Sequence, residues 1–178
     1  MTQSKSLPLV LSVEAVETPL GRLLLAVDGD GALCAADFAD HEDRLIRLLE
    51  RRFASFVPIL SQGRVPTEIT QALAAYFTGD IGAIRSIGLR TGGTLFQQTM
   101  WSALRAIEPG KPMTYSALAA SLGRPNAARA VGHANGTNPF NIIVPCHRLV
   151  GANGDLTGYS GGIERKRWLL DHEAKHAA

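Results

Sequence analysis

Three adjacent residues in the last quarter of the chain, Cys146, His147 and Arg148, could do chemistry together. A cysteine reacts as its thiolate, and neighbouring positive groups lower the pKa of a thiol from about 8.5 towards neutrality. A thiol beside an imidazole and a guanidinium therefore has the local features of an activated nucleophile. Taken alone, this tripeptide is weak evidence of catalysis.

The apolar segment before the cysteine decides how these side chains are presented. Ile142–Val144 is a short apolar run that ends at Pro145, which predicts a buried strand with Cys146 at its end. Adjacent side chains on an extended strand point to opposite faces. We therefore expect the His147 ring not to touch the Cys146 sulfur directly.

The chain has two cysteines in all, and a protein of this size can form a core without a disulfide. We expect both thiols to be reduced, and Cys34 to be an inert, buried, small apolar residue. Two isolated cysteines with scattered histidines do not form the spacings of a structural zinc site, so no metal is predicted. The apolar runs are too short to span a bilayer, and residues 1–13 contain no cleavage-like site. We expect a soluble, cytosolic protein.

Composition and charge place the chain among globular proteins. Its 178 residues suit one large domain or two small ones, with 46% hydrophobic and 19% charged residues. Residues 1–91 carry nine Lys and Arg against eleven Asp and Glu, whereas residues 92–178 carry nine against five, so the net charges are −2 and +4. A positive second half fits an anionic partner. Two solvated surfaces of different composition explain the asymmetry equally well.

The first half of the chain predicts a small sheet with covering helices. Strands are expected at residues 9–16, 22–27, 32–38 and, more briefly, 84–89. The segment Asp28-Gly29-Asp30-Gly31 is typical of a hairpin turn. Helices are expected at 41–53, with Asp40 as N-cap, and at 66–77, with Pro66 in the first turn.

The best candidate for a domain boundary is Thr91-Gly92-Gly93-Thr94, which predicts a sheet domain over 1–91 and a mainly helical domain over 92–178. Beyond it, apolar residues at helical spacing run from Phe96 to Ile107. Two short helices follow, at 114–122 and 126–135, around a turn that contains glycine. That arrangement predicts a helix-turn-helix.

The second helix of this motif departs from the usual recognition helix. It carries small residues around one long cation, Arg129, where a helix that reads base edges normally presents several polar side chains. Ala128, Ala130 and Gly132 would allow close backbone approach to a narrow groove of DNA. A tightly packed contact between two helices accounts for the same composition.

A long pattern surrounds Cys146. It comprises I-V-P-C-H-R-L-V-G at 143–151, L-T-G-Y-S-G-G at 156–162 and R-K-R-W-L-L-D-H-E at 165–173. This pattern resembles the O-6-alkylguanine-DNA alkyltransferases, also called methylated-DNA–protein-cysteine S-methyltransferases, of the bacterial single-chain type. The match extends back to Thr91 and covers about half the chain densely. In the first half, T-P-L-G and the acidic hairpin fit the family in general character.

The resemblance implies an α+β fold in which a ribonuclease-H-like sheet domain precedes a helical domain with a helix-turn-helix and the cysteine strand. It implies DNA repair by irreversible, stoichiometric transfer of an alkyl group from O-6 of guanine, and also O-4 of thymine, to Cys146. The partner would be double-stranded DNA, bound through its minor groove by a monomer, with the damaged nucleotide flipped into the protein. No cofactor is implied, because a thiolate displaces the alkyl group directly.

The resemblance also assigns roles at the reacting centre. Cys146 would accept the alkyl group, and His147 would act as general base through a bridging water while Glu173 orients its ring. Asn138 would join the helix-turn-helix to the cysteine strand. Tyr115 would donate its hydroxyl to guanine N3 and stabilise the leaving base.

Further residues would bind the substrate and the duplex. Tyr159 and Ser160 would wall the pocket and contact O-6, and carbonyl groups near Cys146 and Leu149 would accept from the exocyclic amine of guanine. Arg129 would fill the gap that the flipped nucleotide leaves in the stack. The remaining DNA-contacting positions would be Thr114, Ser116, Ala130 and Gly132.

Rival interpretations are a DNA-damage sensor that does no chemistry, which would lack the acceptor cysteine, and a Cys–His–Glu hydrolase, which would turn over repeatedly. For the other charged residues we expect ordinary roles. Arg165-Lys166-Arg167 is expected to be the solvated face of a helix, although it could form a phosphate patch. His41, His172 and His176 are expected to be solvated, and His133 could touch a phosphate. Arg148 could pair with a carboxylate and serve structure alone.

Overall fold

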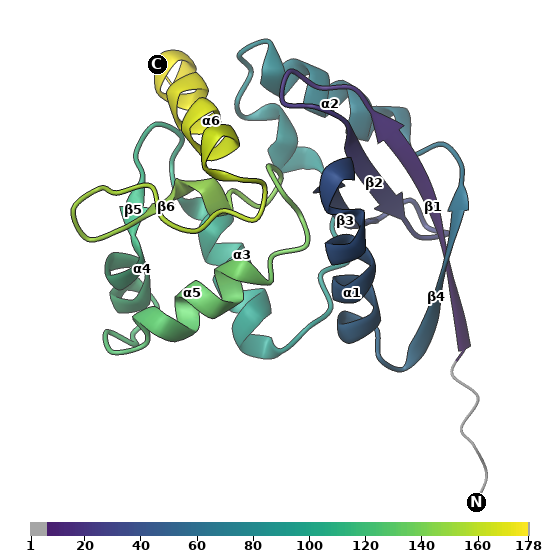
Figure 1. Cartoon of the computed structure of the whole chain (residues 1–178), viewed down its shortest axis with the longest axis horizontal. Helices are drawn as coiled ribbons and strands as arrows, with labels where there is room; N and C mark the ends of the chain where they lie inside the picture. Colours follow the sequence, from purple (N-terminus) through teal and green to yellow (C-terminus); the bar gives the residue numbers. More distant parts are fainter. Residues whose placement is uncertain (1–6, 178) are drawn as a thin grey trace, which may run out of the picture.

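The computed structural model describes residues 7–177, so residues 1–6 of the segment 1–13, in which we expect no cleavage-like site, lie outside it. The first half contains a four-stranded sheet with the strand order β3-β2-β1-β4 (Figure 1). β1 is antiparallel to β2 and parallel to β4, and β2 is antiparallel to β3. The strands are β1 (Leu7–Val16), β2 (Leu23–Val27), β3 (Leu33–Phe38) and β4 (Phe56–Gln62).

The predicted hairpin joins β2 to β3 and is confirmed. The Asp28 carboxylate accepts the backbone N–H groups of Asp30 and Ala32, both at 3.0 Å, and Gly31 has φ +80°. Every residue of β2 and β3 is buried, because helices cover both faces of the sheet.

Alternate residues of the strands pack into two separate clusters. On one face, Leu24 and Ala26 pack against α1 (Glu42–Arg52). On the other, Leu23 and Leu25 pack with α2 (Thr67–Phe77) and with the second half of the chain. The sheet is therefore the middle layer, and the active-site half of the protein rests on the second face.

Three expectations for this half need correction. Asp40 does not cap α1: it lies in a short 3-10 helix, η1 (Ala39–His41), and its carboxylate pairs with Arg165 at 2.9 Å. Residues 84–89 do not form a strand, because the turn after α2 continues into a 3-10 helix, η2 (Ala83–Ser86), which places Ile84 in the core. β4 was not predicted, since Pro58 interrupts its apolar residues and proline is unfavourable inside a strand.

The second half is mainly helical and confirms the predicted helix-turn-helix. Its elements are α3 (Leu95–Ala106), β5 (Met113–Thr114), α4 (Tyr115–Ser121), α5 (Ala128–Gly136), η3 (Cys146–Arg148), β6 (Leu149–Val150) and α6 (Ile163–His176). α3 begins with a capping box between Thr94 and Gln97. α4 and α5 are in contact across a turn in which Gly123 has φ +69°. None of the helices in residues 7–177 is long and apolar enough to cross a membrane.

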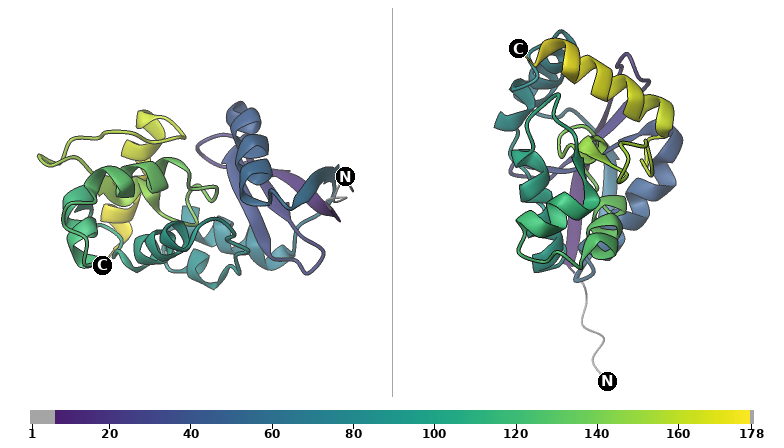
Figure 2. Two further views of the ribbon diagram at one scale, coloured as in Figure 1. Left: turned by 90° about the horizontal axis from the view of Figure 1, so that it is seen from below. Right: turned by 90° about the vertical axis from the view of Figure 1, so that its left-hand side faces the viewer.

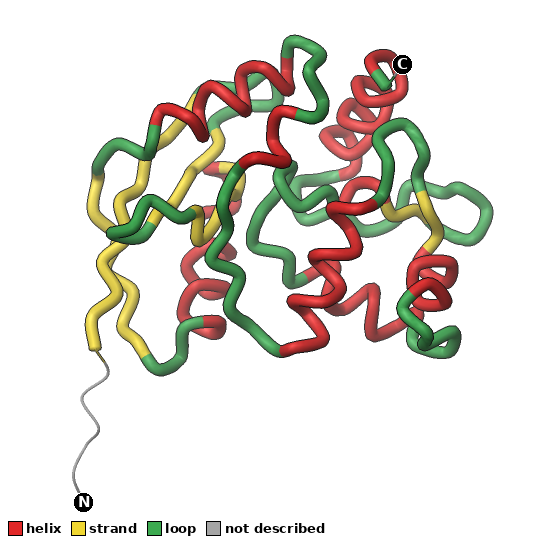
Figure 3. The backbone as a smooth tube through the Cα atoms, turned by 180° about the vertical axis from the view of Figure 1, so that it is seen from behind, coloured by secondary structure: helices red, strands yellow, loops and turns green. Residues whose placement is uncertain are grey.

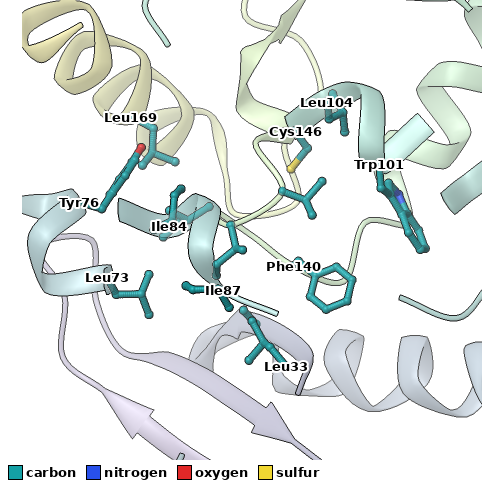
Figure 4. Packing of buried hydrophobic residues seen from close by; sticks show 14 of the residues in the cluster. Leu33, Leu73, Tyr76, Ile84, Ile87, Trp101, Leu104, Phe140, Cys146 and Leu169 are labelled. Carbon is teal, nitrogen blue, oxygen red and sulfur yellow. The ribbon is translucent and has the colours of Figure 1, made fainter. Parts of the chain in front are cut away.

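The two halves share one core. Seen from below, the sheet and the helical half lie side by side (Figure 2), and the loop between η2 and α3 runs down the back of the molecule (Figure 3). Leu33, Ile87, Trp101 and Phe140 come from both halves and belong to one buried cluster, which also includes Cys146 (Figure 4). The division into domains at residues 91 and 92 stays a prediction.

Candidate active site

The loop that carries the cysteine is fastened to the edge of the sheet. The Ala36 N–H of β3 donates to the Pro139 carbonyl, and the Asn141 N–H donates back to the Ala36 carbonyl, both at 2.8 Å. The chain then turns through Ile142, whose φ of +73° is the one positive value found at a non-glycine residue in the described chain. Such a conformation costs about 1–3 kcal/mol and persists where the surrounding structure enforces it.

The predicted strand at 142–144 is therefore wrong. Backbone hydrogen bonds from Val144 to Phe140 and from Cys146 to Val144 fold this segment into turns, and Cys146 begins the 3-10 helix η3. A 3-10 helix has three residues per turn, so successive side chains still diverge. No hydrogen bond joins His147 to the Cys146 sulfur within the described residues; His147 and Arg148 instead bond to Glu173.

Cys146 opens onto a cavity of about 290 Å³ that is close to the lower limit for small-molecule sites. Its lining residues come from α4, α5, η3 and the loop before α6: they are Tyr115, Gly132, Asn135, Gly136, Cys146, Gly158, Tyr159 and Ser160. Five residues expected at the site, from four separate segments, thus meet around one cavity.

The electrostatics of the thiol differ from the expectation. Burial raises the pKa of Cys146 to about 11, although the Asn138 side chain and the charges of Arg44 and Lys166 act to lower it. The prediction that adjacent His147 and Arg148 lower this pKa is wrong, because neighbours in sequence are not the sulfur's neighbours in space. The resting thiol is neutral at neutral pH.

Glu173 is a fully buried carboxylate that three residues share. Its Oε1 accepts from His147 Nε2, Arg148 Nη2 and the Tyr76 hydroxyl, each at 2.9 Å, and its Oε2 accepts from Arg148 Nε at 2.8 Å. Burial acts to raise the pKa of Glu173, but His147 and Arg148 outweigh it and hold the pKa well below its usual range. The alternative that Arg148 pairs with a carboxylate is confirmed.

This arrangement sets the chemistry of His147. An ionised carboxylate can only accept, so Nε2 carries the proton that faces Glu173 and Nδ1 is the basic nitrogen. Within the described part of the chain, Nδ1 is buried without a hydrogen-bond partner. Burial lowers the pKa of His147, with Glu173 opposing the shift. The ring is a neutral base fixed in one tautomer.

Asn138 lies directly after the C-cap of α5 and is fully buried. Its amide Nδ2 donates to the Val144 carbonyl at 2.9 Å, and its Oδ1 accepts from the Phe140 N–H at 3.0 Å. The side chain thus holds both limbs of the cysteine loop beside the helix-turn-helix.

The predicted substrate residues surround the sulfur at different depths. The Tyr115 hydroxyl donates to the Thr157 carbonyl at 3.4 Å, and Ser160 donates to Asn141 Oδ1 at 3.1 Å. The Tyr159 hydroxyl is buried with no partner among residues 7–177. Leu149 is fully buried in β6, so only its backbone could meet a ligand.

The predicted DNA residues divide by exposure. Ser116, Arg129 and Ala130 are exposed, whereas Gly132 is half-buried and lines the cavity. Thr114 is the N-cap of α4, and its hydroxyl accepts from the Ala117 N–H at 3.1 Å. The buried face of α5 consists of Val131, Ala134 and Asn135. The small residues next to Arg129 are therefore not fully buried against other helices.

Two expectations for α6 are wrong. Lys166 is fully buried and its Nζ donates to the Thr157 carbonyl at 2.6 Å, with a pKa that burial lowers to about 8. His172 is also buried, bonded to the Tyr76 carbonyl at 2.8 Å. The spacing of Lys166, Leu169 and Glu173 on one helical face was the available signal. His41 and His176 are half-buried and His133 is exposed.

The two cysteines agree with the expectation that both are reduced. Both cysteines are free thiols, and burial raises the pKa of Cys34 to about 11, which fits an inert buried residue. Sequence reasoning missed Asp37 and Tyr76, whose contacts with the site span long separations along the chain.

Comparison with known proteins agrees with the geometry. A family model described as "6-O-methylguanine DNA methyltransferase, DNA binding domain" matches residues 95–175, and one described as the "ribonuclease-like domain" of the same methyltransferase matches residues 12–90. A methylated-DNA–protein-cysteine methyltransferase of Salmonella typhimurium is 47% identical over 160 residues, which cover 90% of this chain and 94% of that protein. The chain belongs to the 6-O-methylguanine DNA methyltransferase family.

Solved structures of this family share the fold. A Mycobacterium tuberculosis relative in complex with DNA is 37% identical, with a TM-score of 0.76 over 93% of this chain and 94% of that one. The O6-methylguanine-DNA methyltransferase of Pyrococcus kodakaraensis is 29% identical, with a TM-score of 0.68 over 92% and 98%. The expected family and α+β fold are therefore confirmed.

The role of the buried Glu173 carboxylate in stability can be tested by substitution. Glu173→Gln leaves the buried Arg148 charge uncompensated and should lower the free energy of unfolding by about 3–5 kcal/mol at neutral pH. Because the folded pKa of Glu173 lies below its unfolded value of about 4.3, the wild-type advantage is present above that pH and lost as the pH falls below it. Urea unfolding at pH 7 and near pH 3 measures both effects.

The matched control is Glu164→Gln on the same helix, where an exposed carboxylate pairs with Arg167. This exposed pair should change stability by less than about 1 kcal/mol. Equal losses for the two variants, or a Glu173→Gln deficit that persists undiminished at low pH, would contradict the role given to Glu173.

Proposed function

We propose that the protein repairs DNA by direct reversal of damage, moving an alkyl group from O-6 of guanine to the Cys146 sulfur. The observation that carries the proposal is the meeting of a buried thiol, a base-sized cavity and the His147–Glu173 pair. Membership of a methyltransferase family and a structural relative solved with DNA support it.

The proposed reaction begins with removal of a proton from a neutral thiol. His147 Nδ1 takes the proton through a bridging water, and Glu173 stabilises the imidazolium that forms. The Cys146 sulfur then attacks the alkyl carbon, so that an S–C bond forms as the C–O-6 bond breaks. The guanine leaves as an anion stabilised by the Tyr115 hydroxyl at N3.

The product limits the protein to one reaction. The thioether on Cys146 is not reversed by water or by cellular thiols, so each molecule acts once and needs no cofactor. We include O-4-alkylthymine as a second substrate of the same pocket. Transfer requires a reduced thiol, which supports a cytosolic location for a chain with two free cysteines.

We propose that duplex DNA binds through its minor groove to the helix-turn-helix of a monomer, within a domain formed by residues 92–178. The exposed Arg129 and Ala130 support this, because small residues permit close approach while the guanidinium fills the gap left by the flipped nucleotide. Residues 1–91 form the sheet domain that holds the cysteine loop.

The first test is a titration with duplex DNA that carries O-6-methylguanine. Transfer should stop at one equivalent per protein, and Cys146→Ser should transfer nothing while it still binds the duplex. A damage sensor would transfer no methyl even as wild type, and a hydrolase would exceed one equivalent. Transfer retained by Cys146→Ser would defeat the assignment.

The second test concerns Arg129. Arg129→Ala should slow the repair of duplex DNA on the order of tenfold or more, because unstacking a base costs a few kcal/mol that the inserted side chain partly offsets. The reaction with free O-6-benzylguanine should change little, since no stack has to be opened. Rates of single-turnover transfer to each substrate provide the measurement.

Arg64→Ala is the control for charge alone, since Arg64 is an exposed arginine of the sheet half that pairs with Glu14. It should leave both rates unchanged. Equal losses on duplex and free base for Arg129→Ala would discredit the proposed insertion.

A further inference from the structure

The side chain of Asn141 contacts the Cys146 sulfur, and neither its position nor its contacts follow from the family pattern described above. Asn141 is fully buried in the cysteine loop. Its amide oxygen Oδ1 lies 3.7 Å from Cys146 Sγ, within range of an S–H hydrogen bond, and accepts from Ser160 Oγ at 3.1 Å. Its amide nitrogen Nδ2 donates to Asp37 Oδ1 on β3.

The orientation of this amide is fixed by the charge on Asp37. Asp37 Oδ2 forms an ion pair with Arg44 Nη1 at 2.6 Å, and Oδ1 also accepts from the Phe38 N–H at 2.9 Å. An ionised carboxylate only accepts hydrogen bonds, so the amide must turn Nδ2 towards Asp37. The carbonyl oxygen of Asn141 is then left facing the sulfur.

Arg44 extends the arrangement to the helix-turn-helix. Its Nη2 donates to the carbonyls of Gly136 at 2.8 Å and Asn138 at 3.0 Å, at the C-terminal end of α5. The chain of contacts from α5 through Arg44, Asp37 and Asn141 to the sulfur thus crosses from one half of the protein to the other and back.

A carbonyl oxygen treats the two forms of a cysteine differently. It accepts a hydrogen bond from a thiol but repels a thiolate, because both atoms then carry negative charge. We propose that Asn141, oriented by the Asp37–Arg44 pair, holds the Cys146 sulfur in its protonated, unreactive form in the resting protein. This inference rests on the proposed function, because "unreactive" here means unable to attack the alkyl group.

Other groups that face the sulfur must be kept constant in any test. They are Asp37 on β3, Arg44 on α1, Lys166 on α6 and the phenols Tyr115 and Tyr159, whereas the ring of His147 bonds to Glu173. Asn141 itself carries no charge. Its replacement therefore removes the carbonyl contact and one donor to Asp37, and it leaves all these titratable groups in the protein.

The experiment is a pH titration of the Cys146 thiolate by its ultraviolet absorbance, each variant being compared with its own Cys146→Ser derivative. Loss of one hydrogen bond of ordinary strength, made by the thiol but not by the thiolate, lowers the thiol pKa by roughly half a unit or more. Asn141→Ala should therefore lower the thiol pKa by about that amount, which raises the thiolate fraction at a fixed lower pH about threefold. Asn141→Ser, too short to reach both Asp37 and the sulfur, should shift it the same way.

Alkylation by iodoacetamide supplies a second readout that needs no DNA. The rate at the Cys146 peptide should rise about twofold below the pKa, because a thiolate loses some intrinsic nucleophilicity as its pKa falls. The rate at the Cys34 peptide of the same molecules should not change. Since no lesion is involved, failure of the proposed repair activity would leave this result intact.

Ser160→Ala separates the carbonyl contact from simple hydration of a larger cavity. It opens space beside the same Asn141 oxygen but removes a competing donor, so the thiol pKa should stay unchanged or rise slightly. An Asn141→Ala pKa that is unchanged or raised, even with lower stability in urea, would overturn the proposal. A Ser160→Ala pKa that falls as much as that of Asn141→Ala would overturn it as well.

Discussion

In the proposed reaction the Cys146 sulfur must become an anion, yet it lies where burial favours its neutral form. Burial raises the pKa of Cys146 to about 11, so at neutral pH the resting nucleophile is a thiol. A protein that can react only once gains from this constraint, because a permanent thiolate would meet small electrophiles before it met a damaged base. Proton removal is therefore the step that the proposed roles of the other site residues serve.

We assign a part in that step to a second buried ionisable group, Glu173. Its carboxylate neutralises Arg148, fixes His147 in the tautomer whose Nδ1 is basic, and accepts the hydroxyl of Tyr76. Tyr76 belongs to α2 and Asp37 to β3, both in the sheet half. Side chains of the sheet half thus fix the positions of the Glu173 carboxylate and the cysteine loop. The helical half alone would leave both less constrained.

The sequence predicted those features that depend on interactions between residues close together in the chain. The acidic hairpin, the helix-turn-helix and the motif around Cys146 depend on turn residues and short spacings. β4 could not be predicted, since it pairs in parallel with a strand some fifty residues earlier and Pro58 interrupts its apolar residues. The turn at Ile142, the burial of Lys166 and the raised pKa of Cys146 depend on distant neighbours, which no window of sequence contains.

In the proposed reaction, the Cys146 sulfur takes the alkyl carbon permanently. Intact mass spectrometry after incubation with excess duplex that carries O-6-methylguanine tests it most directly, followed by mapping of the modified peptide. We expect a mass gain of a single methyl group, located on the peptide that contains Cys146. An unmodified protein, a second methyl group, or a methyl on the Cys34 peptide would contradict it.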